Sequence, residues 1–415
     1  MKEVFENLES GVRSYCRKYP TVFKKAKNAE MYSADGTRYI DFLAVAGSMN
    51  YGHNNLEIKK AIMQYLEDDN IINALDMYTE AKEEFLQTFN ELILQPRKLN
   101  YKVMCCGPTG TNAVEAALKL ARKNTRRTGI IAFSGAFHGM SLGSLALTTD
   151  QTSRQGAGIP LEHVTFVPYD GNGIVDSVEY LKMMLNDDHS GIEKPAAIVL
   201  ETIQAEGGIN VASVDFLQRL RKLCTEEDIL MIIDDIQVGN GRAGTFFSFE
   251  RANIVPDMVV LSKSISGFGM PMALLLMKPE LDIFKPAEHN GTFRGNQLSF
   301  IGGTAGIRYF VGHNLDKEVT RKAKMIQEFI EKEILPIDNR IVYRGMGLIW
   351  GIDLNKIGSK YAIDVIHEAF NNHLIMEVAG RKDGVLKIMP PLTIEDNTLL
   401  EGLQKVKVAI IKVIG

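Results

Sequence analysis

Three segments carry residues whose types and spacing could do chemistry. Asp234 follows the apolar run at residues 229–233, and Lys263 follows the apolar run at 258–261. Residues 107–113 place glycines and hydroxyls directly before an alanine-rich helical pattern. A charge at the end of a buried strand is costly unless it is paired or used, and the N–H groups of a helix start favour an anion. Taken alone, each feature also fits a helix cap, a turn residue or a solvated strand exit.

The three features together describe one kind of site. A phosphate cup, an acid and a lysine at successive strand ends suit a phosphorylated cofactor that a lysine holds as a Schiff base, with the acid opposite a ring nitrogen. Pyridoxal 5'-phosphate (PLP) is the cofactor with those needs. The sequence therefore predicts PLP as the cofactor.

A rival motif lies nearby. Residues 239–244 match G-x-G-x-x-G after a strand, but the aromatic-rich stretch that follows has no helical pattern. A dinucleotide site needs a helix N-terminus that faces the pyrophosphate. We therefore interpret this motif as a glycine-rich turn and keep a nicotinamide dehydrogenase as a rival hypothesis. The histidines show no metal-ligand spacing, so no metal is predicted.

The elements that position these residues follow a regular order. Apolar runs that predict buried strands lie at residues 130–133, 164–167, 196–200, 229–233, 258–261 and 272–277. Helical patterns at 112–124 and 214–224 separate several of them. Strand and helix in alternation predict a doubly wound α/β sheet, whose ligand site lies at the carboxyl ends of the strands.

The last hundred residues have a different pattern. Residues 321–334 and 361–370 are amphipathic, and short strands are predicted at 348–352 and 386–389. We predict a large cofactor domain at residues 51–314 and a small α+β domain at 315–415, which the N-terminal segment 1–50 joins.

Composition narrows the class of protein. The 415 residues are 45% hydrophobic and carry a net charge of −4, so no broad basic face for nucleic acid is expected. No apolar run approaches the length of a membrane span, which argues against a membrane protein. The four cysteines contain no C-x-x-C pair and fit reduced thiols in a cytoplasmic protein.

Longer motifs resemble a known family. Residues 201–208 (Glu-Thr-Ile-Gln-Ala-Glu-Gly-Gly), 234–242 (Asp-Asp-Ile-Gln-Val-Gly-Asn-Gly-Arg) and 261–271 (Leu-Ser-Lys-Ser-Ile-Ser-Gly-Phe-Gly-Met-Pro) are similar to the class III (ω-amino acid) aminotransferases of fold type I. The likeness spans nearly the whole chain. It implies an α/β fold like that of aspartate aminotransferase, with a large, mixed, mostly parallel sheet and a small α+β domain. It also implies a homodimer or tetramer whose active site is shared across the interface.

The resemblance assigns roles to individual residues. Lys263 would hold the cofactor and then move a proton, and Asp234 would keep the pyridine nitrogen protonated. The further cofactor contacts are Gln237 to the ring oxygen, Phe137 and Ile236 to the ring faces, Gly110 and Thr111 to the phosphate, and Thr292 to the phosphate of the neighbouring subunit. His138 either tunes the cofactor or is a packed structural residue, and both interpretations stay open.

Substrate binding is implied for a second group of residues. In related enzymes the glutamate that corresponds to Glu206 pairs with an arginine and releases this arginine to a substrate carboxylate. In this chain Lys387 stands at the position of the arginine. Lysine keeps the charge but loses the bidentate fork. Glu201 belongs to the same motif, and Arg294 and Arg381 are further candidates for gripping the carboxylates of 2-oxoglutarate.

The expected reaction follows from the closest branch of the family. Residues 9–15, 50–54, 107–117 and 289–296 are similar to members that act on L-2,4-diaminobutyrate and 2-oxoglutarate in ectoine synthesis. This implies transfer of the amino group of L-glutamate to L-aspartate 4-semialdehyde. The alternatives are the same chemistry on another amine or aldehyde (4-aminobutyrate, ornithine or a secondary-metabolite aldehyde), an intramolecular aminomutase, and a non-catalytic relative.

Overall fold

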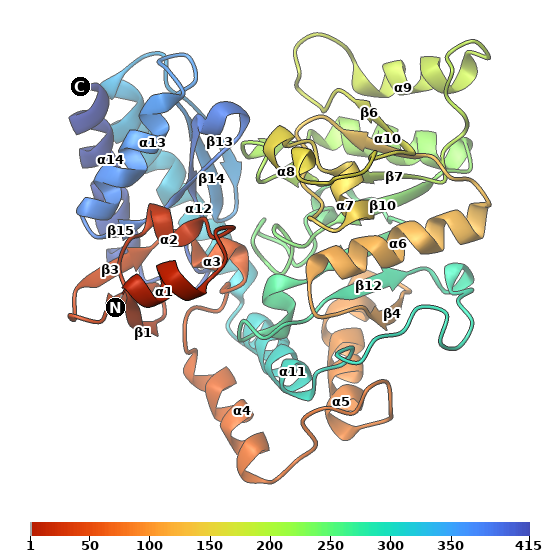
Figure 1. Cartoon of the computed structure of the whole chain (residues 1–415), viewed down its shortest axis with the longest axis horizontal. Coiled ribbons are helices and arrows are strands. Elements are labelled where there is room, and N and C mark those ends of the chain that lie inside the picture. Colours follow the sequence, from red (N-terminus) through yellow and green to blue (C-terminus); the bar gives the residue numbers. More distant parts are fainter. Residues whose placement is uncertain (1) are drawn as a thin grey trace.

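The computed structural model describes residues 2–415. Its larger half, residues 56–312, is built around one large sheet (Figure 1). The strands of this seven-stranded sheet are, in spatial order, β4 (Lys102–Cys105), β12 (Leu274–Met277), β11 (Met258–Leu261), β10 (Leu230–Asp234), β7 (Ala197–Leu200), β5 (Ile130–Phe133) and β6 (Val164–Val167). The strands from β11 to β6 are parallel, and β12 is antiparallel to both of its neighbours. The prediction of a mixed, mostly parallel sheet is confirmed.

Helices cover both faces of the sheet. Alternate strand residues separate into two apolar clusters: one contains Ile232 and the buried face of α6 (Gly110–Thr125), and the other contains Ile233 and the buried face of α10 (Val214–Glu226). The central strands are buried on both faces, which is why their sequences are unbroken apolar runs. The remaining helices of this half are α4 (Leu56–Glu67), α5 (Glu80–Phe89), α7 (Leu142–Leu147), α8 (Gln151–Gln155), α9 (Ser177–Asn186) and α11 (Gln297–Gly312).

One strand of the sheet was not predicted. β4 is an edge strand whose residues are exposed or half-buried, so its sequence Lys-Val-Met-Cys contains no continuous apolar run. The helix predicted at 321–334 also differs in its limits. Regular helix α12 spans Leu315–Phe329, and residues 330–334 form a wider π-helical turn.

The smaller half contains two further four-stranded sheets. The first joins β1 (Phe23–Lys27), β2 (Glu30–Ser33) and β3 (Arg38–Asp41) to β15 (Leu374–Ile375), and the second joins β13 (Val342–Met346), β14 (Ile349–Asp353), β17 (Val385–Ile388) and β16 (Glu377–Ala379). Around them lie α1 (Lys2–Leu8), α2 (Tyr15–Lys18), α3 (Ala44–Gly47), α12, α13 (Lys360–Asn371) and α14 (Asp396–Ile414). The parallel pairing of β15 with β3 places the N-terminal strands against the C-terminal part of the chain.

No helix of residues 2–415 is both long enough and apolar enough to cross a membrane.

Arg242 connects the two halves. Its side chain is fully buried and donates hydrogen bonds to the carbonyl oxygens of Leu348 (2.9 Å) and Pro390 and to Oδ1 of Asn50 (2.6 Å). No carboxylate in residues 2–415 lies within ion-pair distance of it. Burial lowers the pKa of Arg242 to about 9, and the more distant charge of Asp41 offsets this only in part.

Arg242→Met is expected to lower the free energy of unfolding by about 3 kcal/mol, because it leaves buried acceptors without donors. Urea denaturation followed by circular dichroism measures the loss. Arg340→Met is the matched control, because Arg340 is 53% exposed and pairs with Asp338 at the surface, and it should change stability little. Equal stability of the Arg242→Met variant and the wild type would contradict this role.

Candidate active site

A cavity of about 180 Å³ opens at the carboxyl ends of β10 and β11. This is the position that the doubly wound pattern predicts for a ligand. Every predicted cofactor residue except Thr292 lines it, and so do Glu201 and Glu206: the members are Gly110, Thr111, Phe137, His138, Glu201, Glu206, Asp234, Ile236, Gln237 and Lys263. The fold therefore brings together residues that are up to 153 positions apart in the sequence.

Asp234 ends β10 with its carboxylate facing His138. The distance between Asp234 Oδ2 and His138 Nδ1 is 2.7 Å, and Asp234 Oδ1 accepts a hydrogen bond from the backbone of Ile236 at 3.1 Å. Both side chains are almost fully buried. Burial favours the neutral imidazole, but the hydrogen bond and the charge of Asp234 outweigh it and raise the pKa of His138. His138 therefore contacts the acid directly and fixes its orientation.

Lys263 lies just beyond β11 in an unusual backbone conformation. Its φ angle is +54°, which costs a non-glycine residue about 1–2 kcal/mol. Ser264 anchors this turn, since its hydroxyl donates to the carbonyl oxygen of Gly47 at 2.7 Å and accepts from the backbone of Asn50 at 3.0 Å. Burial, which the charge of Glu206 offsets only in part, lowers the pKa of Lys263 to about 8. The amine can therefore be neutral near physiological pH, as a nucleophile or base requires.

Glu201 is a second buried acid of the cavity. Its two carboxylate oxygens accept hydrogen bonds from the backbone N–H groups of Phe137 (3.0 Å) and Ala205 (3.2 Å). Burial raises the pKa of Glu201 to about 7. Glu201 thus holds the loop that carries Phe137 and can exchange a proton near neutral pH.

Glu206 forms the ion pair that the resemblance implied. Its Oε1 lies 2.6 Å from Nζ of Lys387. Burial by itself would raise the pKa of Glu206, but the ammonium groups of Lys387 and Lys263 lower it, so Glu206 is ionised. Lys387 is 1% exposed and lies behind Glu206 as seen from the cavity, since Glu206 lines the cavity and Lys387 does not.

The start of α6 has the hydrogen-bond donors that an anion site requires. A Cβ atom at Gly110 would lie 2.8 Å from Cδ1 of Ile236, so a larger residue would require the end of the Ile236 side chain to shift. Thr111 Oγ1 lies 2.5 Å from Ser144 Oγ, which adds a second hydroxyl beside the helix N-terminus. The first N–H groups of a helix have no partner within the helix. Together these donors suit a phosphate.

Besides Lys387, three predicted residues do not line the cavity of their own chain. Thr292 is exposed in the segment before α11, and Arg294 donates a hydrogen bond to the carbonyl oxygen of His289. Arg381 lines a wider cleft of about 770 Å³, which shares Phe137 and Glu206 with the cavity. Arg294 therefore lies outside the group of substrate candidates that line the cavity or the cleft.

The residues of the cavity fit PLP. The donors at the start of α6 suit its phosphate, the Lys263 amine suits its aldehyde, and the Asp234 carboxylate suits its pyridine nitrogen. Gln237 donates to the carbonyl oxygen of Ala46 at 3.2 Å, and its Oε1 is buried without a hydrogen-bond partner in residues 2–415. Such an unpaired buried oxygen indicates a missing partner.

Sequence reasoning missed two residues of the site. Ser144 follows a loop with no distinctive motif, so only the fold brings it to Thr111. Glu377 lies 3.5 Å from Nζ of Lys387 across a strand pair. The available signal for Glu377 was an acid within the apolar stretch 374–379, which could have marked it as buried.

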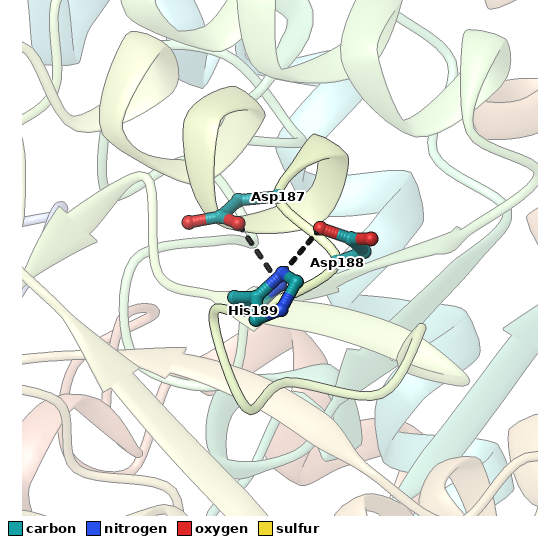
Figure 2. Close-up of side chains that lie close together, drawn as sticks. All are labelled: Asp187, Asp188 and His189. Carbon is teal, nitrogen blue, oxygen red and sulfur yellow. Dashed lines mark hydrogen bonds and ion pairs between the residues drawn. The ribbon is translucent and has the colours of Figure 1, made fainter.

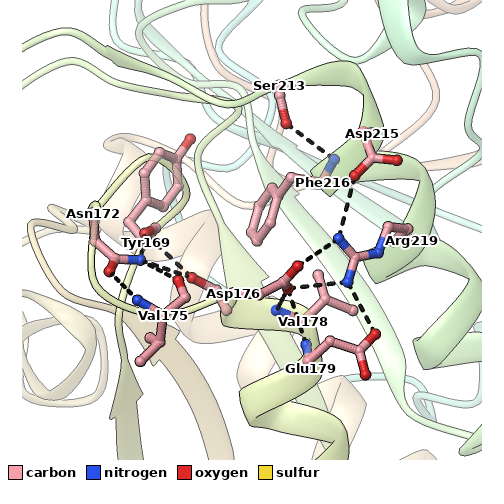
Figure 3. Close-up of polar contacts among 11 residues, drawn as sticks. Tyr169, Asn172, Val175, Asp176, Val178, Glu179, Ser213, Asp215, Phe216 and Arg219 are labelled. Atoms are coloured by element: carbon pink, nitrogen blue, oxygen red, sulfur yellow. Dashed lines mark hydrogen bonds and ion pairs between the residues drawn. The ribbon is translucent and has the colours of Figure 1, made fainter.

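Two polar clusters outside the cavity lie at the surface. Asp187, Asp188 and His189 approach one another after α9 and could each offer one metal ligand, but all three are exposed (Figure 2). His189 satisfies them in part, with hydrogen bonds from its backbone to Asp187 (2.9 Å) and between its ring and Asp188 (2.7 Å). In a second cluster Arg219 bridges Asp176, which caps α9, to Asp215 and so joins α9 to α10 (Figure 3). Neither cluster adjoins the cavity.

The family model described as aminotransferase class-III matches residues 13–410. The chain is 51% identical over 405 residues to a diaminobutyrate–2-oxoglutarate transaminase of Halalkalibacterium halodurans, which covers 96% of this chain and 94% of the relative. It is 49% identical over 409 residues to the protein of the same name from Streptomyces coelicolor, with 97% and 96% covered. Among solved structures, an ornithine aminotransferase of Toxoplasma gondii with partial occupancy of PLP has a TM-score of 0.85 at 22% identity, with 99% and 94% covered.

Proposed function

Because the chain belongs to the class-III aminotransferase family, we propose that it is a PLP-dependent diaminobutyrate–2-oxoglutarate transaminase. It would transfer the amino group of L-glutamate to L-aspartate 4-semialdehyde and give 2-oxoglutarate and L-2,4-diaminobutyrate. The observation that carries this proposal is the near full-length similarity to relatives of that name, on a chain whose cavity joins Lys263, Asp234 and an anion site.

The side chains divide the chemical work. When bound, PLP supplies an electron sink for the bond that breaks at the amine-bearing carbon of the substrate. Nζ of Lys263 would move the proton between that carbon and the cofactor, which its lowered pKa permits. Asp234, held by His138, keeps a negative charge opposite the ring nitrogen. Glu201 keeps the Phe137 loop in place beside the ring.

The Glu206–Lys387 pair lets one cavity accept two kinds of substrate. With the pair closed, the region beside Lys263 carries no free cation from Lys387, which suits a terminal amine. When Glu206 moves away, Lys387 can bind the carboxylate next to the reacting carbon of glutamate or 2-oxoglutarate. A lysine suffices for this exchange, because the incoming substrate carboxylate takes the place of the Glu206 carboxylate.

A substrate panel tests the proposed reaction. With L-glutamate as donor, L-aspartate 4-semialdehyde is expected to be the best acceptor, ahead of succinate semialdehyde, glutamate 5-semialdehyde and a neutral aldehyde. Formation of 2-oxoglutarate, measured with a coupled dehydrogenase, gives kcat/KM for each acceptor. If another aldehyde were a better acceptor than L-aspartate 4-semialdehyde, the enzyme would act on another ω-amine. Isomerisation of an amino acid without any 2-oxo acid would indicate an aminomutase.

The proposal includes a homodimer or tetramer with shared active sites. Exposed apolar side chains cluster on α4 and on the segment that follows it, which supports a covered face: Leu66, Ile71, Ile72, Met77 and Tyr78. Thr292 is exposed and does not line the cavity of its own chain, and we place it at the phosphate of the neighbouring subunit.

Mixing two inactive variants tests this shared site. Lys263→Ala and Thr292→Asp subunits, refolded or exchanged together at equal amounts, should recover about a quarter of the wild-type activity, because half of the dimers then contain one intact site. Each variant alone should be nearly inactive. A monomer in light scattering, or no recovery despite subunit exchange, would contradict the shared site.

We place the enzyme in the cytoplasm and in ectoine synthesis. The four cysteines, none of which forms a disulfide within residues 2–415, support the first, and the reaction product supports the second. Accumulation of ectoine that depends on this gene would test both the product and the pathway.

A further inference from the structure

Lys387 has two carboxylate partners, one of which is part of its own sheet. Its Nζ lies 2.6 Å from Oε1 of Glu206 and 3.5 Å from Oε2 of Glu377. Glu377 and Lys387 stand directly opposite each other in the antiparallel pair of β16 and β17. Glu377 is 5% exposed and Lys387 is 1% exposed. The contact between these two residues is therefore set by strand register and lies within the core of the smaller half.

The two partners differ in their freedom to move. Glu206 follows β8 (Ile203–Gln204) in the larger half, and its side chain is 31% exposed to the cavity and the cleft. Glu377 lies on β16, which is paired with β17, and its side chain has little exposed surface. An arriving substrate carboxylate can thus displace Glu206 but not Glu377.

The charges around Glu377 suit a residue that pairs with Lys387 when Glu206 moves away. Burial disfavours the ammonium form of Lys387, but Glu206 and Glu377 outweigh it and raise its pKa. Oε2 of Glu377 has no hydrogen bond within residues 2–415, so it can accept one from Lys387 when Glu206 leaves. Oε1 of Glu377 lies 3.8 Å from Nζ of Lys18 on α2, which balances part of the second negative charge.

We propose that Glu377 is a positioning residue that holds Lys387 at its place in the core while Glu206 exchanges with a substrate carboxylate. Lys387 then has two carboxylate neighbours before the exchange (Glu206 and Glu377) and two after it (the substrate and Glu377). Without Glu377, departure of Glu206 would leave a buried ammonium unpaired, which is a costly state. The inference rests on the proposed function, because it needs a substrate that brings a carboxylate.

Thermal unfolding of the cofactor-loaded enzyme tests the contact between Glu377 and Lys387. Glu206→Gln and Glu377→Gln each leave Lys387 one carboxylate, and each should lower Tm by roughly 2–3 °C. The double variant leaves none, so its loss should clearly exceed the sum of the two. Adding Lys387→Met to the double variant removes the buried charge and should restore most of the loss, even where the double variant folds poorly. Additive losses would overturn the proposal.

Binding of glutarate tests the positioning role directly. Glutarate has two carboxylates and no reactive group, and its affinity for the cofactor-loaded enzyme is measured by calorimetry. Glu377→Gln should weaken it about tenfold and raise KM for 2-oxoglutarate similarly, with a much smaller change in kcat. Glu333→Gln, which breaks a 2.6 Å ion pair with Lys407 on the surface of the same half, should change neither.

The possible outcomes separate the two proposals. Wild-type affinity for glutarate in Glu377→Gln would overturn the role of Glu377, whatever the substrate of the enzyme. Absence of turnover with the proposed substrates by the wild type, together with a glutarate affinity that depends on Glu377, would overturn the proposed function and support the positioning role.

Discussion

Lys263→Ala is expected to lower kcat by roughly 10⁵-fold or more and to remove the visible absorption of the cofactor-loaded protein. The variant loses the amine that binds the cofactor and the base that moves the substrate proton, and both functions belong to one atom, Nζ. Burial and the left-handed turn at Lys263 place this amine in the cavity with a pKa of about 8. A residue with two such roles should show a larger loss than any other residue of the site.

Absorption spectra and single-turnover kinetics measure the two losses separately. Lys222→Ala is the control, because Lys222 is 74% exposed on α10 and pairs with Glu226 at the surface. It should keep both the spectrum and the rate. A Lys263→Ala variant that turned over at a tenth of the wild-type rate would contradict the assignment of the base.

The pH dependence of cofactor uptake adds a test of the same amine. The neutral amine is the reactive form, so uptake of PLP by the apoprotein should speed up as pH rises through about 8, the lowered pKa of Lys263. An ordinary lysine would place this rise near pH 10.4. Stopped-flow absorbance measures the rate, and a midpoint above pH 10 would contradict the effect of burial.

The sequence was most informative where burial and chemistry occur together. β10 and β11 are buried on both faces, so their apolar runs predicted strands, and the charges that follow predicted Asp234 and Lys263 at the site. The start of α6 was visible because glycines and hydroxyls lead directly into an alanine-rich pattern, whose alanines are buried in the structure.

Features that depend on pairing between distant segments could not be predicted. The role of Glu377 depends on the register of β16 and β17, and neither short strand carries a pattern that fixes it. Ser144 reaches Thr111 only because a loop returns to the start of α6. The positive φ of Lys263 has no sequence signature either, since residues with this conformation are usually glycine or asparagine.

Asp234→Asn is expected to lower kcat by roughly 10³-fold. The variant should still fold, and it should bind the cofactor more weakly than the wild type does. Asparagine keeps the size of the side chain and can still accept from the backbone of Ile236, but it has no negative charge to hold a proton on the ring nitrogen. The change also removes the charge that raises the pKa of His138. The expected loss is therefore electrostatic and not steric.

The neighbouring acid provides a matched control. Asp235 is fully buried one residue later, does not line the cavity, and accepts a hydrogen bond from the backbone of Ser248 at 3.0 Å. Burial raises the pKa of Asp235 to about 7, so much of it is already uncharged near neutral pH. Asp235→Asn should therefore change kcat by less than about threefold. Equal losses in the two variants would mean that packing at the end of β10, and not the charge of Asp234, sets the rate.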